Sequence, residues 1–96
     1  MKQDEVLNLS DVQVVIDSIE DVRFDSHDFI REYISKFASS YGLLLIKHGN
    51  VNTAHGEIAN FLKANASELH IIQLQQPSFT PNIFNNTTEC ESWQKV

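Results

Sequence analysis

The sequence predicts a small α+β domain that is predominantly helical, and three observations lead to this prediction. Three stretches repeat apolar side chains at helical spacing, and residues that cap helices well precede them. The last quarter of the chain instead holds a short β-branched segment, two prolines and a polar end. The 96 residues suffice for one domain with a modest core and are too few for two. We therefore expect a single domain over 1–96, with three helices followed by a short C-terminal strand pair or hairpin.

The first helix is expected over about residues 11–22. Ser10 and Gln13 have the spacing of a capping box, in which each side chain satisfies a free backbone N–H. Apolar residues then recur at helical spacing, and acidic residues fall on the opposite face: Asp17, Glu20 and Asp21. Residues 1–9 carry no such pattern, so we expect a flexible N-terminus there.

The second helix is expected over about residues 25–48, with Asp25 as its N-cap. A long apolar stripe follows at spacings of three and four, which is typical of the central helix of a core. Gly42 allows two endings: the helix stops there and a short buried strand follows, or it continues to Gly49. Because the apolar stripe continues unbroken past Gly42, we favour the longer helix, although an internal glycine costs about 1 kcal/mol.

The third helix is expected over about residues 53–64, where apolar side chains again recur at helical spacing. A strand over about 70–75 follows, and Pro77 should end it because proline has no N–H to donate. The composition of residues 77–88 predicts a loop. The last segment, about 88–95, forms either a return strand paired with 70–75 or a short helical turn.

The net charge of −6 is concentrated in the first third of the chain, because residues 1–32 hold nine acidic and three basic side chains. A negative surface repels nucleic acid and anionic lipid and attracts a basic partner. The simpler explanation is a solvated helix face that keeps the protein in solution.

No catalytic or metal-binding motif is visible, so we expect no cofactor and no metal. His48 and His55 flank one turn, yet no third ligand lies near them in the sequence, and zinc sites use three or four protein ligands. Cys90 lies between Glu89 and Glu91, whose charges raise the pKa of a thiol, so an idle thiol is expected.

Three features of the sequence indicate where in the cell the protein is located. The first five residues are polar with no apolar stretch behind them, and the longest apolar run has four residues, Leu43 to Ile46. A signal peptide needs a longer apolar stretch, and a membrane span needs about 20 residues. The chain has one cysteine, which cannot form a disulfide within the chain. We therefore expect a cytoplasmic protein without a membrane partner.

These observations favour a non-enzymatic protein-interaction or regulatory domain, with Asp17, Glu20 and Asp21 as its partner-binding residues. Trp93 either anchors the polar tail to the core or, if exposed, adds to that binding surface. The partner is an unknown protein, and self-association into a homo-oligomer is also open.

The alternative is a nucleic-acid-binding domain, because the order helix, turn, helix, strand resembles that of winged-helix modules. Helix 53–64 would then enter the major groove and present His55, Asn60 and Lys63. The absence of arginine from this face counts against this hypothesis. A third hypothesis, an enzyme with an unrecognised site, has no sequence feature in its favour.

Overall fold

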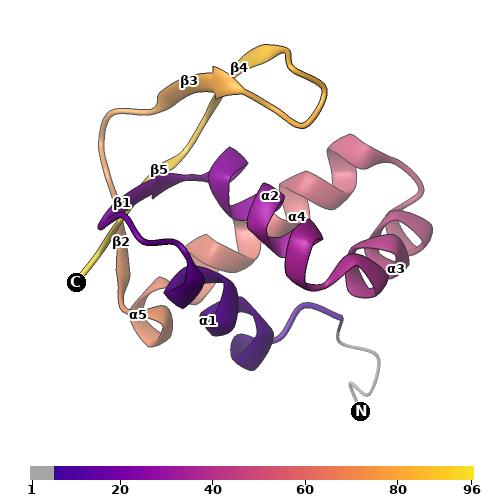
Figure 1. Ribbon diagram of the computed structural model, residues 1–96, viewed down its shortest axis with the longest axis horizontal. Helices are drawn as coiled ribbons and strands as arrows, with labels where there is room; N and C mark the ends of the chain where they lie inside the picture. Colours follow the sequence, from indigo (N-terminus) through magenta and orange to yellow (C-terminus); the bar gives the residue numbers. More distant parts are fainter. Residues whose placement is uncertain (1–5) are drawn as a thin grey trace.

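The computed structural model describes residues 6–96 and confirms a mixed α+β fold over them (Figure 1). Its elements follow in the order α1 (Leu9–Ser18), β1 (Arg23–Asp25), α2 (Ser26–Lys36), α3 (Ala38–His48), α4 (Val51–Ala64), α5 (Ala66–Leu69), β2 (Ile71–Gln73), β3 (Ser78–Pro81), β4 (Thr87–Cys90) and β5 (Ser92–Lys95). None of the helices in the described part of the chain is long and apolar enough to cross a membrane.

The first helix begins earlier than predicted. Its N-cap is Asn8, whose Oδ1 accepts a hydrogen bond from the Asp11 backbone N–H at 2.8 Å, so the predicted capping box at Ser10 is wrong. Part of the predicted flexible segment, residues 1–5, lies outside the described residues. In the remainder, Val6 and Leu7 pack against the core, and Leu9 already belongs to the first helix.

The first helix also ends earlier than predicted, at Ser18. Glu20 and Asp21 therefore lie in the turn that leads into β1, and not on a helix face. The chain is extended at this point because it joins the sheet: the Lys95 backbone N–H donates to the Val22 carbonyl oxygen at 2.9 Å. A hydrogen bond to a distant strand overrides the local helical pattern here.

The predicted helix of residues 25–48 starts and ends where the sequence indicates. Asp25 caps α2 in a capping box with Asp28, and Gly49 ends α3 in the left-handed conformation, with φ of 82°. The chain is helical through Gly42, so the longer of the two alternatives is confirmed.

This helix is nevertheless broken at Phe37, which the sequence pattern did not predict. The backbone leaves the helical region there, with φ −133° and ψ 54°. An unbroken helix over residues 26–48 would be about 35 Å long, as long as the 34 Å longest dimension of the whole domain. The break lets Tyr41 and Leu44 of α3 reach the core, whereas Phe37 itself is half-buried.

The third predicted helix is α4, which begins two residues earlier than expected. Asn50 caps it by accepting a hydrogen bond from the Thr53 backbone N–H at 2.8 Å. Asn65 ends it, and the short helix α5, which we did not predict, follows at once. The left-handed conformation of His70, with φ of 57°, ends α5 and turns the chain into β2.

The main sheet has the order β1-β5-β2, and both pairings are antiparallel. The predicted pairing of a return strand with residues 70–75 is thereby confirmed for β2 and β5. Strand β1 was not predicted, and the return strand is interrupted at Glu91, so that β4 and β5 belong to different sheets. The order of elements is compatible with the winged-helix-like order that the sequence suggested.

Strands β3 and β4 form a separate hairpin, which we call the wing. Figure 1 shows it at the opposite side of the domain from α1. The prediction of a loop over residues 77–88 is therefore wrong for β3 and for the start of β4. Pro81 is compatible with a strand here because it lies at the end of β3, in a sheet of only two strands.

One core joins α1, α2, α3, α4, α5 and the main sheet. Its largest fully buried side chains are Trp93, Tyr33 and Phe29. Trp93 lies in the central strand β5, opposite Phe24 of β1 and Gln73 of β2. The anchoring role suggested for Trp93 is thus confirmed, and its exposure on a binding surface is not observed.

Candidate functional site

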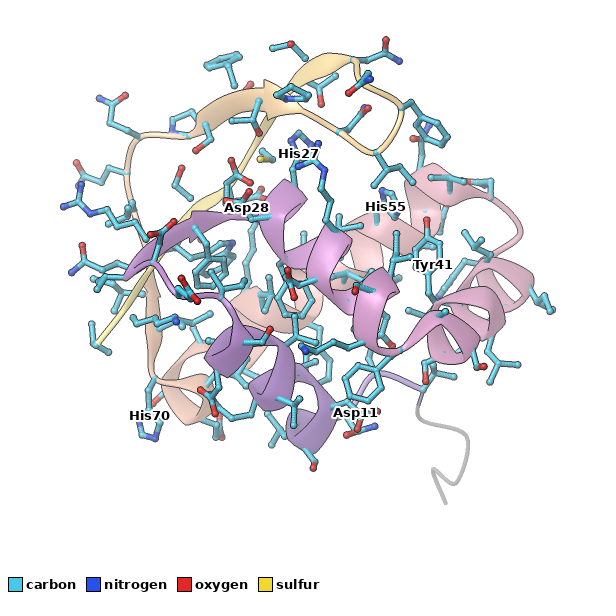
Figure 2. All side chains as sticks on the ribbon, viewed as in Figure 1. Asp11, His27, Asp28, Tyr41, His55 and His70 are labelled. Atoms are coloured by element: carbon cyan, nitrogen blue, oxygen red, sulfur yellow. The ribbon has the colours of Figure 1, made fainter. Side chains whose placement is uncertain are left out.

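Three side chains that can carry out acid–base, thiol or metal-binding chemistry lie close together where the start of α2 meets the wing. Asp25 and His27 are 6% and 8% exposed, and Cys90 at the end of β4 is half-buried. One donor atom from each of the three residues lies within 4.8 Å of the others. Figure 2 shows the His27 ring rising from the start of α2 toward the wing.

The fold brings these residues together through β1 and β5. Asp25 is both the last residue of β1 and the N-cap of α2, so His27 falls in the first turn of the helix. Asp25 pairs with Ser92 of β5, and the Ser26 backbone N–H donates to the Glu91 carbonyl oxygen at 3.0 Å. Cys90, one residue before Glu91, is therefore held beside the helix start.

The Thr80 hydroxyl of the wing links the group. It donates to Asp25 Oδ2 at 2.9 Å and lies 2.8 Å from His27 Nδ1. Since its single proton goes to Asp25, Thr80 accepts a hydrogen bond from His27 Nδ1–H. The other ring nitrogen of His27 lies 3.3 Å from the Thr88 hydroxyl, and Thr80 Oγ1 lies 4.0 Å from Cys90 Sγ. Hydrogen bonds thus fix the orientation of the buried imidazole.

The Cys90 thiol is not an activated nucleophile in this setting. Burial raises its pKa, and the Asp25 charge adds to the rise. Backbone N–H groups of His27 and Ser26 and the Thr80 hydroxyl act in the opposite direction without overcoming the burial. The direction agrees with the sequence-based expectation, although the main cause is burial and not the neighbouring glutamates.

A pocket of about 640 Å³ opens beside this group, between the start of α2, α4 and the wing. His27, Cys90 and Glu91 line one part of it, and Gly56 and His55 of α4 line another. His27 and Cys90 are therefore within reach of solvent and of small ligands, whereas Asp25 does not line this pocket.

His55 does not stand on the open face of α4 as the nucleic-acid hypothesis requires. It is half-buried, and its Nε2 lies 2.7 Å from the Tyr41 hydroxyl (Figure 2). Burial lowers the pKa of His55, and the charge of nearby His27 lowers it further. The native fold thus favours the neutral imidazole, which accepts a hydrogen bond from Tyr41.

This arrangement predicts a loss of stability in mild acid. The pKa of His55 is lower in the folded protein than in the unfolded chain, where it is about 6.5. The contribution of His55 to the unfolding free energy is therefore fully present above the unfolded pKa and is lost as the pH falls below it. The unfolding free energy from urea titrations should therefore decline from pH 7.5 to 5, as measured with about half-unit steps. His55→Gln should flatten this decline, whereas His70→Asn, at an exposed position with positive φ, should leave it unchanged. Equal slopes for His55→Gln and wild type would contradict the assignment.

The predicted acidic residues are exposed, although they do not share a helix face. Asp17 lies in the last turn of α1, where it accepts a hydrogen bond from Gln13 Nε2 at 3.0 Å. Glu20 and Asp21 lie in the following turn, and both are exposed. Within residues 6–96 the structure holds one ion pair, and it involves none of these three carboxylates.

The other two residues of the nucleic-acid hypothesis have different surroundings. Asn60 is exposed on α4, as predicted. Lys63 Nζ lies 3.3 Å from Glu91 Oε2, so its charge is paired within the domain. Glu57 is exposed on the same helix, and its negative charge disfavours contact with a phosphate backbone.

Sequence reasoning missed the group formed by Asp25, His27 and Cys90. The short Asp-x-His spacing at 25–27 was visible in the sequence. Cys90, however, lies far along the chain, and the acidic residues on either side of it disfavour a thiolate. Only the pairing of β1 with β5 reveals that Cys90 lies close to Asp25 and His27.

Comparison with known proteins finds no matching family model, no similar curated protein and no similar solved structure.

Proposed function

We propose that this domain is a non-enzymatic protein-interaction module of the cytoplasm that binds a basic partner through Asp17, Glu20 and Asp21. The observation that carries the proposal is the exposure of three carboxylates within five positions, with no ion pair to any of them in the described residues. Unpaired surface charges are free to contact a partner, and complementary charge increases the rate and specificity of association.

The charge distribution supports the same choice of partner. The overall charge is −6, and the first third of the chain carries this excess. A basic protein segment is attracted to such a surface, whereas nucleic acid and anionic lipid are repelled. The raised pKa of Cys90 argues only against this thiol as a nucleophile, because a protonated thiol is a weak nucleophile.

Nucleic-acid binding is the second candidate, and the topology favours it. Helix α4 precedes β2, the wing lies between β2 and β5, and β5 pairs with both edge strands. A winged-helix module uses the corresponding helix in the major groove. Of the three residues that this hypothesis needs on α4, only Asn60 has no side-chain partner within residues 6–96, because Lys63 is paired with Glu91 and His55 with Tyr41, so we rank this candidate second.

A titration of labelled random duplex DNA, followed by fluorescence anisotropy, separates the two candidates. For an interaction module we expect binding no tighter than roughly 10⁻⁴ M at physiological salt. Tight binding that falls steeply with salt would instead support the winged-helix function. In that case Lys63→Ala should reduce the salt dependence by about one unit, and Asn60→Ala should relax base preference.

Capture of partners from a host lysate on the immobilised domain tests the leading proposal directly. We expect mass spectrometry to identify a protein with a basic segment that is released by added salt, because screening weakens contacts between exposed charges. The purified partner should then bind the domain alone. Partners that are acidic, or that stay bound irrespective of salt, would contradict the proposal.

A further inference from the structure

We propose that Asp25, His27 and Cys90 form a binding site for a transition metal ion of the zinc class. The site lies where the first turn of α2 meets the end of β4, and it is separate from the acidic surface of the proposed function. The inference rests on the distances among three donor groups, on how they are held, and on the pocket beside them.

The distances suit a single ion. One carboxylate oxygen, one imidazole nitrogen and the thiol sulfur lie within 4.8 Å of one another. In a tetrahedral zinc site the bonds measure about 2.0–2.3 Å, so the donor atoms are roughly 3.3–3.8 Å apart. A side-chain adjustment of about an ångström would therefore bring all three donors into bonding range.

The donor residues are held on rigid elements. Asp25 Oδ1 accepts a hydrogen bond from the Asp28 backbone N–H at 2.8 Å, which fixes the carboxylate at the helix start. Each ring nitrogen of His27 lies beside a hydroxyl, that of Thr80 or that of Thr88, so the nitrogen that binds the ion gives up its hydroxyl partner and the other nitrogen keeps its own. Metal sites use such partners behind the ligands to orient them, and a pre-oriented donor loses less entropy on binding.

The donor types select the class of ion. A thiolate together with an imidazole favours zinc, cobalt and related ions over magnesium or calcium, which prefer oxygen donors. On binding, the thiol of Cys90 releases its proton to the solvent and the sulfur bonds to the ion. Three protein ligands leave a fourth position, and the adjacent pocket of about 640 Å³ can supply a water molecule for it.

Cobalt(II) is the most direct probe of the site, because its absorption spectrum reports ligand type and geometry. Under reducing conditions we expect a near-ultraviolet band from charge transfer between thiolate and cobalt, together with the visible bands of tetrahedral cobalt. The bands should saturate at one equivalent of metal and disappear when zinc displaces the cobalt. No thiolate band at saturating cobalt would overturn the proposal.

Three variants assign the ligands. Cys90→Ser should abolish the thiolate band, and His27→Gln and Asp25→Asn should each lower the affinity at least about tenfold. Asparagine caps helices as well as aspartate does, so Asp25→Asn keeps the fold while removing a charged ligand. The control His70→Asn, far from the cluster in Figure 2, should retain full binding. A band that persists in Cys90→Ser, or equal losses in all four variants, would place the metal elsewhere.

Thermal unfolding gives an independent readout. A metal that binds only the folded chain stabilises it by mass action, so zinc should raise the melting temperature by several degrees and EDTA should reverse the rise. Cys90→Ser should show no rise. An equal rise in Cys90→Ser and wild type would contradict the site, and the absence of any rise at a zinc concentration that displaces cobalt would do so as well.

Discussion

Replacing Trp93 with alanine should lower the unfolding free energy by roughly 3–5 kcal/mol, the usual cost of removing a large aromatic side chain from a core. Trp93 has 0% exposure and lies in the central strand of the main sheet. Its Nε1–H donates to the Ser26 hydroxyl at 3.1 Å, which ties β5 to the start of α2. Alanine would leave a cavity where the sheet meets the helix and would remove one of the two hydrogen bonds of the Ser26 hydroxyl, which would keep its contact with Glu91 Oε1.

Urea titration followed by circular dichroism measures the loss. The matched control is Phe79→Ala, because Phe79 is also an aromatic residue in a strand but is 67% exposed. The control should cost less than about 1 kcal/mol. If Trp93→Ala leaves too little folded protein to measure, Trp93→Phe should still lower the unfolding free energy. Equal costs for the Trp93 and Phe79 variants would contradict the assignment of Trp93 as the anchor of the core.

The sequence predicted helix ends well where a local signal sets them. Asp25 and Gly49 mark ends of helices through interactions within a few residues, so their roles are visible without the fold. The break at Phe37 has no such signal. It arises because a straight helix would be as long as the domain, a constraint that only the packed structure imposes.

Strands were predicted less completely, because they are short and depend on distant partners. β1 has three residues, too few to show an alternating pattern, and it exists through its pairing with β5 about seventy positions later. β3 ends in Pro81, a residue that normally argues against a strand. Its place in a two-stranded hairpin removes that objection.

The candidate metal site shows the same limitation for chemistry. From the sequence, Glu89 and Glu91 are the neighbours of Cys90, and they suggest an idle thiol. In the fold, Cys90 instead lies near the side chains of Asp25, His27 and Thr80 and near the first backbone N–H groups of α2. The reactivity of a thiol and its capacity to bind a metal depend on these spatial neighbours, and no short sequence motif predicts them.

Reversing the three exposed carboxylates, Asp17→Lys, Glu20→Lys and Asp21→Lys together, should weaken binding of a basic partner at least about 100-fold. Like charges facing each other across an interface cost several kcal/mol, and each 1.4 kcal/mol corresponds to about tenfold in affinity. The fold should tolerate the change, because all three side chains are exposed. A cation at position 17 also suits the last turn of α1, where the helix dipole favours positive charge.

A matched reversal elsewhere distinguishes a specific surface from the effect of overall charge. Glu57→Lys, Glu68→Lys and Glu89→Lys together change three exposed carboxylates on α4, α5 and β4. Each triple variant raises the formal net charge from −6 to zero. A partner that recognises the end of α1 should bind the control nearly as well as wild type, and should lose its salt-dependent attraction only in the first variant. Equal losses in both variants would mean that the partner responds to the total negative charge of the domain and that Asp17, Glu20 and Asp21 have no particular role.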